Sequence, residues 1–335
     1  MQTKIDNTQG LLAILIGDGR SLITLTGLIL IGSGVFASFQ AMTGYFLPHD
    51  EAYLGTTAAE LCAINECRIV HFMIHDRISF GGALVAVGTL YLYLAAVPLA
   101  QGQAWAWWTL VLSGLVGFAS FLSYLGYGYL DTWHGVGTLA LLPIFIAGLA
   151  RTRSLVPSTP LGVLKQPGVR WPWASSAGAG RFLLLITAAC LMLGGGIIMT
   201  VGMTTVFVPE DLGYMRMTPA DFDAVNPRLI PLIAHDRAGF GGGVMCCGLT
   251  MLLCVWCAQP SRALWQALLV TGVVGFGTAI GVHLPIGYTT LTHLAPAYLG
   301  ALMFAVGITL TYPAMARHGR AAAAKPGSAA PTITT

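Results

Sequence analysis

The sequence predicts an all-α integral membrane protein with eight transmembrane helices, arranged as two tandem four-helix bundles. Three observations predict this fold class: an extreme apolar composition, eight apolar runs of membrane-spanning length, and an internal repeat. Of the 335 residues, 56% are hydrophobic and only 9% are charged. Because a soluble domain needs far more charge to keep its surface hydrated, the composition places the chain in a lipid bilayer.

The spans follow from the thickness of the membrane. A bilayer core of about 30 Å requires about 20 apolar residues of helix. The predicted spans are 22–46, 77–100, 105–128, 134–150, 182–206, 237–258, 263–286 and 293–314. A Pro-, Ser- and Gly-rich linker separates the fourth span from the fifth. The predicted units are a first four-helix unit at 1–150, a cytoplasmic linker at 151–180, a second four-helix unit at 181–316 and a disordered cytoplasmic tail at 317–335.

Basic residues predict the orientation of these spans. Eleven Lys and Arg residues lie on the side of the termini and the linker, and five lie on the opposite side. The positive-inside rule therefore predicts a multi-pass protein of the cell inner membrane with both termini cytoplasmic and with the loops at 47–74 and 207–234 outside. No cleaved signal peptide is evident, because Asp18 and Arg20 interrupt the first apolar run. The net charge of +3 is too small to indicate a nucleic-acid partner.

The two halves repeat one another in detail. The motif H-D-R-x-x-F-G-G begins at His75 and again at His235, and the motif F-x-P-x-D begins at Phe46 and again at Phe207. Each unit holds an even number of spans, so the two copies have the same orientation. We therefore expect a pseudo-two-fold axis along the membrane normal.

Four of the eight histidines form repeat-matched pairs, His75 with His134 and His235 with His293. Each pair joins the second and fourth helices of one unit at their outer ends. Two imidazoles facing each other across a four-helix bundle are typical of a bis-histidine haem or metal site. The alternative is that these histidines are interfacial polar caps and that the small residues beside them only permit close helix packing.

Each repeated histidine is followed by an acidic and a basic residue, Asp76 with Arg77 and Asp236 with Arg237. An Arg can hold haem propionates or an anionic substrate, and an Asp can orient an imidazole, so all four residues are candidates for cofactor binding. The alternative is an interfacial ion pair with a snorkelling Arg.

Two further histidines occur in one half only. His71 precedes His75 by four residues, whereas the second half has Pro231 at the matching position. His283 lies on the third helix of the second unit, where the first unit has Tyr124. The asymmetry suggests that one unit kept chemistry that the other lost, with sequence drift as the alternative.

Cys62 and Cys67 lie five residues apart in the first outer loop. An oxidising compartment favours a disulfide bond between them. The bond either stabilises the fold of the loop or is redox-active.

Eight helices in two four-helix units, with histidines on the second and fourth helix of each and a cysteine pair in the first outer loop, resemble the haem A synthases. The chain departs from that family's E-x-x-H-R signature, because Phe72 and Leu232 stand where Glu is required, and Asp76 and Asp236 stand where Arg is required. The resemblance implies a haem-binding membrane protein of similar layout, without the family's carboxylate chemistry.

The leading hypothesis is a haem-binding membrane redox protein or a haem-modifying enzyme, an oxidoreductase whose partner is a quinone or another redox membrane protein. One alternative is a transporter built from parallel repeats. Another is a non-catalytic assembly partner that docks a protein through acidic residues of its outer loops, namely Asp50, Glu60, Asp211 and Asp221.

Overall fold

The computed structural model describes residues 16–122, 128–157 and 160–323, and within them the chain is helical and contains no strand. Among the described residues, eight helices are long and apolar enough to cross a membrane, which confirms the predicted all-α fold with eight spans. They are α2 (Arg20–Met42), α5 (Arg68–Ala96), α6 (Ala104–Leu122), α7 (Thr132–Thr152), α8 (Ser176–Gly202), α11 (Leu229–Cys257), α12 (Arg262–Gly281) and α14 (Leu291–Ala323).

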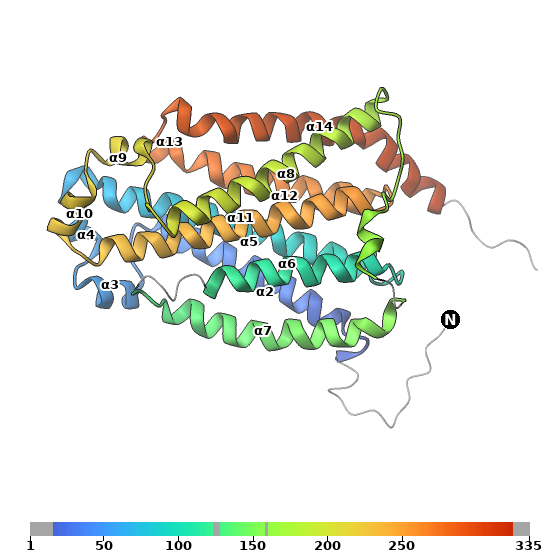
Figure 1. Ribbon diagram of the computed structural model, residues 1–335, viewed down its shortest axis with the longest axis horizontal. Coiled ribbons are helices and arrows are strands. Elements are labelled where there is room, and N and C mark those ends of the chain that lie inside the picture. The colour runs from blue at the N-terminus through green and yellow to red at the C-terminus, as the bar shows by residue number, and fades with distance from the viewer. Residues whose placement is uncertain (1–15, 123–127, 158–159, 324–335) are drawn as a thin grey trace, which may run out of the picture.

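Short helices gather at one end of the molecule, which we call the loop end (Figure 1). The first long loop folds into α3 (Pro48–Leu54), α4 (Ala58–Cys62) and the 3-10 turn η1 (Asn65–Cys67), and the second folds into α9 (Pro209–Met215) and α10 (Pro219–Val225). One more short helix, α13 (His283–Ile286), joins α12 to α14. The linker turns η3 (Arg153–Leu155) and η4 (Leu161–Lys165), the start of α2 and the end of α14 lie at the opposite end.

Two boundaries differ from the prediction in a way that matters for function. Helix α5 begins at Arg68 and α11 begins at Leu229, well before the expected starts at 77 and 237. Both H-D-R motifs therefore lie inside long helices instead of at their ends. Helix α14 also continues to Ala323, into the segment predicted to be disordered, and residues 324–335 lie outside the described part of the chain.

The two halves pack into one interlocked body. Helices α5 and α11 pack against each other at the centre. Helix α5 also packs along α2 of its own half and along α12 of the other half, while α11 packs along α8 of its own half and along α6 of the other. Two separate tandem bundles are therefore not confirmed, because each central helix belongs to the core of both halves.

The two glycines of the first motif explain how α5 contacts both halves. A Cβ atom at Gly81 would lie 2.2 Å from the Oγ atom of Ser38 on α2. A Cβ atom at Gly82 would lie 1.8 Å from the Oγ1 atom of Thr278 on α12. Small residues let helices approach closely in a membrane. The first glycine thus packs within its half and the second packs across halves.

The second motif makes the matching contacts. A Cβ atom at Gly241 would lie 2.3 Å from the backbone nitrogen of Met199 on α8, and one at Gly242 would lie 2.4 Å from Cβ of Ser120 on α6. We therefore attribute the G-G pair of the motif to helix packing on two sides.

We expect Gly242→Ala to lower the melting temperature of the purified protein, because an added methyl group at a tight contact costs about 1–3 kcal/mol. Gly277→Ala on α12 is the control. A Cβ atom added at Gly277 would have no described atom of another helix within 4 Å, so the methyl group fits without a clash. Thermal unfolding in detergent checks both variants. Equal melting temperatures for the two would contradict the close contact.

Candidate metal centre and buried ion pairs

The charged residues of the first motif form a buried network across the halves. The Nε atom of Arg77 donates to Oδ2 of Asp236 at 2.7 Å, and its NH1 group donates to Oδ2 of Asp50 at 2.8 Å. The hydroxyl of Tyr129 donates to the other oxygen of Asp50. Asp50 is only 1% exposed. The network joins the first long loop, α5 and α11.

The second motif forms the corresponding network. Arg237 pairs with Asp211 of its own half through NH1, and its Nε lies 3.5 Å from Oδ2 of Asp76 of the other half. The hydroxyl of Tyr288 donates to Oδ1 of Asp211 at 2.7 Å. Both carboxylates are fully buried. Because an unpaired buried charge is very costly, these contacts tie the two halves together.

The networks bear on three expectations about charged residues. Each motif Arg already has two carboxylate partners within the chain, and its use as a propionate ligand stays a prediction. Asp76 does lie beside an imidazole, with Oδ1 3.2 Å from Nδ1 of His75. Asp50 and Asp211 are buried, so they do not present a docking surface.

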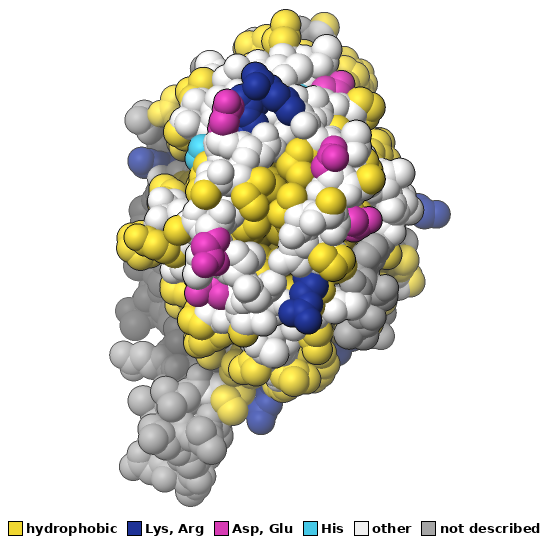
Figure 2. Space-filling view, turned by 90° about the vertical axis from the view of Figure 1, so that its left-hand side faces the viewer, with side chains coloured by type: hydrophobic (Ala, Val, Ile, Leu, Met, Phe, Trp, Pro, Cys, Tyr) yellow, Lys and Arg dark blue, Asp and Glu magenta, His cyan; other side chains and the backbone are white. Residues whose placement is uncertain are grey.

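Figure 2 looks onto the loop end and shows the exposed charged side chains spread around an apolar centre.

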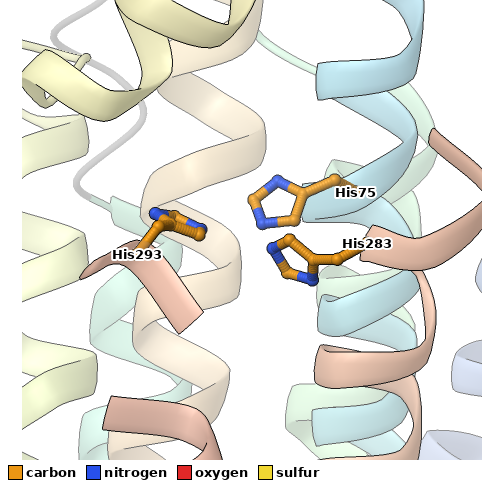
Figure 3. A group of neighbouring side chains, drawn as sticks. All are labelled: His75, His283 and His293. Atoms are coloured by element: carbon orange, nitrogen blue, oxygen red, sulfur yellow. The ribbon is translucent and has the colours of Figure 1, made fainter. Parts of the chain in front are cut away.

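Three histidines converge beneath the loop end, as Figure 3 shows. His75 on α5, His283 on α13 and His293 on α14 each offer one ring nitrogen, and these nitrogens lie within 4.8 Å of one another. The ring centroid of His75 lies 4.6 Å from that of His283 and 5.8 Å from that of His293. His75 and His283 are each 3% exposed. We call these residues the three-histidine cluster.

Tyr288 orients one ring of this cluster. Its hydroxyl donates to Asp211 and lies 3.1 Å from Nδ1 of His293. A hydroxyl that donates its hydrogen to a carboxylate accepts from the imidazole, so Nδ1 of His293 carries the proton and Nε2 keeps its lone pair for a ligand. Burial and the neighbouring Asp211 raise the pKa of Tyr288, which keeps the phenol protonated.

A second group surrounds Asp131, the residue that precedes α7. His134 Nδ1 lies 3.0 Å from Oδ2 of Asp131 and 3.0 Å from Nε2 of His235, and the two rings stack at 5.2 Å. His49 Nε2 lies 3.0 Å from Oδ1 of the same carboxylate. Burial alone would raise the pKa of Asp131, but the hydrogen bonds and charge of His134 and the charge of His235 hold it well below its usual value.

The histidines therefore pair across the halves, and the expected pairs within each half are wrong. His75 contacts His293 instead of His134, and His235 contacts His134 instead of His293. The physical reason is the packing at the centre, where α5 faces α12 and α13 and α11 faces α6.

A haem iron held by two opposite imidazoles needs their nitrogens about 4 Å apart, twice a metal–nitrogen bond of about 2 Å, and a slot for the macrocycle. His134 and His235 are in direct contact at 3.0 Å. In the three-histidine cluster, His283 lies beside both other rings, where the macrocycle would be. The described geometry fits a single metal ion better than haem.

The two long loops are hydrogen-bonded to each other. Cys62 and Cys67 form a disulfide in the first loop, as predicted. The NH1 group of Arg68 donates to the carbonyl of Tyr214 in the second loop, and that of Arg228 donates to the carbonyl of a first-loop residue, Tyr53. These two arginines, which stand at matching places at the starts of α5 and α11, each bind a backbone carbonyl of the other loop.

Comparison with known proteins gives no relative: no family model, curated protein or solved structure matches the chain. The fold and the site define its class by themselves. Over the part of the chain that the structure describes, it is an all-α protein with eight helices of membrane-spanning character and with histidine groups that could hold a metal ion.

Proposed function

We propose that this chain is a membrane redox protein that binds one copper or iron ion through the three-histidine cluster. The observation that carries the proposal is the convergence of three imidazoles from α5, α13 and α14 at one buried point. Imidazole suits zinc, copper, iron and nickel, and among these copper and iron exchange electrons readily in proteins.

The surroundings of the cluster support a bound ion. Asp76 lies 3.2 Å from His75, and the Tyr288 hydroxyl lies 3.1 Å from His293. Metal-bound histidines commonly have such a partner on their other nitrogen, which fixes the ring and makes it more basic. A structural role for the histidines as polar caps does not require three rings to meet.

Stacked aromatic rings support electron exchange in preference to a purely structural ion. Tyr288 stacks on His293 at 4.3 Å, and Tyr214 stacks on Tyr288 at 4.5 Å. Tyr214 is partly exposed in the second outer loop. The run of rings leads from the cluster to the surface of the loop end, where a redox partner protein has access.

Haem is the second candidate for the same position. The ring contact between His75 and His293, two histidines that both recur in the repeat, favours it, and His283, which lies beside both rings, would then have to move aside. The absorption spectrum separates the two candidates, because a single copper or iron ion gives no Soret band.

We expect about one copper or iron ion per chain in protein purified without chelator, measured by elemental analysis. His283→Ala should lower metal affinity by more than about tenfold, since it removes one of three ligands. His71→Ala is the matched control, a histidine of α5 outside the cluster, and should keep the metal. Equal metal content in the His283 and wild-type proteins, or a Soret band that His283→Ala leaves unchanged, would contradict the metal-ion proposal.

A further inference from the structure

A cavity of about 380 Å³ lies between α2, α5, α6, α7 and α11. Small-molecule sites in proteins commonly span roughly 300–1,000 Å³. The cavity reaches His134 and His235 but none of the three-histidine cluster, so it is a different site from the proposed metal centre.

The mouth of the cavity faces the lipid. Phe36 of α2 and Trp133 of α7 both line it, and they are 53% and 66% exposed. Its walls are mainly apolar and include Phe80, Phe118 and Phe121. A ligand that enters through this mouth must itself be soluble in the membrane.

The inner end of the cavity is polar and acidic. Its charged lining among the described residues consists of Asp50, Asp131, Asp236 and Arg77. Arg77 is already paired with Asp50 and Asp236. A phosphate or a carboxylate would meet uncompensated negative charge here, whereas a neutral group with carbonyl or hydroxyl oxygens would not.

His134 offers the contact for such a group. Its side chain is 38% exposed, and both of its polar contacts to the described residues use Nδ1. With the Nδ1 proton directed to Asp131, Nε2 accepts a hydrogen bond from a ligand hydroxyl, and once protonated it donates to a ligand carbonyl. One residue thus suits both redox forms of a quinone.

We infer that this cavity binds a lipid-soluble quinone, with the ring against His134 and the isoprenoid tail leading out past α2. The acidic inner end disfavours a phospholipid headgroup and the propionates of haem. An acyl chain alone would leave the polar end of the cavity without a partner. The inference concerns a second site and stands independently of the metal.

The two halves differ at these positions. In the second half, Thr290 stands where the first has Asp131, Glu210 stands where it has His49, and the added histidine is His283. Related sites have therefore diverged, one toward three convergent imidazoles and one toward an open cavity with a single exposed imidazole.

The test is a titration of the purified full-length chain with decylubiquinone, followed by quenching of tryptophan fluorescence, to which Trp133 at the mouth contributes. We expect saturable quenching. His134→Ala should weaken binding by about tenfold, the value of one hydrogen bond. Absence of saturable quenching in the wild-type protein would overturn the inference.

A pair of glycine variants separates the cavity from the fold. Gly137 on α7 lines the cavity, and a Cβ atom added there would have no described atom of another helix within 4 Å. The larger side chain of Gly137→Leu therefore fits without disturbing the fold but fills the cavity. We expect this variant to abolish quenching. Gly135→Leu is equally open but lies outside the lining, and it should bind as the wild type does. Equal binding by both variants would overturn the site.

Competition identifies the occupant. Displacement of decylubiquinone by oleic acid at equal concentration, or by haemin with a saturable Soret change, would overturn the quinone assignment in favour of an acyl chain or haem. Metal content measured in the same samples reports separately on the three-histidine cluster, so failure of one site does not imply failure of the other.

Discussion

Replacing Arg237 with Met is expected to abolish most of the stably folded protein. Arg237 is 5% exposed, and its guanidinium pairs with Asp211 and Asp76, which are fully buried. Removing one partner of a buried ion pair costs about 3–5 kcal/mol, because the remaining charges stay buried without compensation. The free energy of unfolding of a whole domain is about 5–15 kcal/mol. Size-exclusion chromatography and thermal unfolding in detergent measure the loss.

Arg262→Met is the control for this variant. Arg262 is exposed at the start of α12, so its replacement should leave the melting temperature within a few degrees of the wild type. A triple variant that combines Arg237→Met with Asp211→Asn and Asp76→Asn removes the charges together and should recover part of the lost stability. If Arg237→Met melted as Arg262→Met does, the buried network would not hold the halves together.

The same network explains why hydropathy predicted the spans but not the starts of α5 and α11. A hydropathy window reads residues such as Asp76 and Arg77 as the edge of a membrane span. Here the charged groups find partners on another helix, so the helix continues past them to Arg68. Apolar composition is sufficient to predict that a segment spans the membrane. Where the helix begins depends on whether its charged residues find partners on other helices, which is a property of tertiary packing.

The repeat identified which histidines matter but not which ones meet. Two tandem copies allow a histidine of α5 to face the fourth helix of either half, and the sequence repeat is the same in both arrangements. The close approach of Gly82 to α12 and of Gly242 to α6 determines the outcome. His283 has Tyr124 as its counterpart, so the repeat did not identify it as a partner of His75. Its position on α13 brings the two rings together.

Asp131 was not predicted because its role combines a local signal, the helix cap, with contacts to residues that are distant in the sequence. It is the N-cap of α7, where its Oδ1 accepts hydrogen bonds from the backbone N–H groups of Trp133 and His134. Its other contacts reach His49 and His235 from distant parts of the chain. The sequence can predict the helix cap, because the cap is local. It cannot predict which distant histidines contact the same carboxylate.

Replacing Asp131 with Asn is expected to destabilise the protein strongly at neutral pH and less at acid pH. Asn keeps the N-cap acceptor, so the variant removes the charge that faces His49, His134 and His235. Hydrogen bonds to a charged group contribute about 1.5–3 kcal/mol. Because the folded protein holds the pKa of Asp131 below its usual value, this stabilisation is present above the unfolded pKa of about 4 and is lost as pH falls through the folded pKa.

Melting temperatures of the wild type and of Asp131→Asn, measured from about pH 7 down to about pH 3, check this expectation. The difference between the two proteins should be constant from about pH 7 to about pH 5 and should begin to shrink between about pH 4 and about pH 3, because the unfolded chain starts to bind the proton there. Asp221→Asn is the control, because the Asp221 carboxylate also accepts a backbone hydrogen bond at the start of a helix, from the N–H group of Thr218, the N-cap of α10, but is exposed, so solvent weakens its charge interactions. A difference for Asp131→Asn that stays constant with pH would show that shape, and not charge, accounts for the role of this residue.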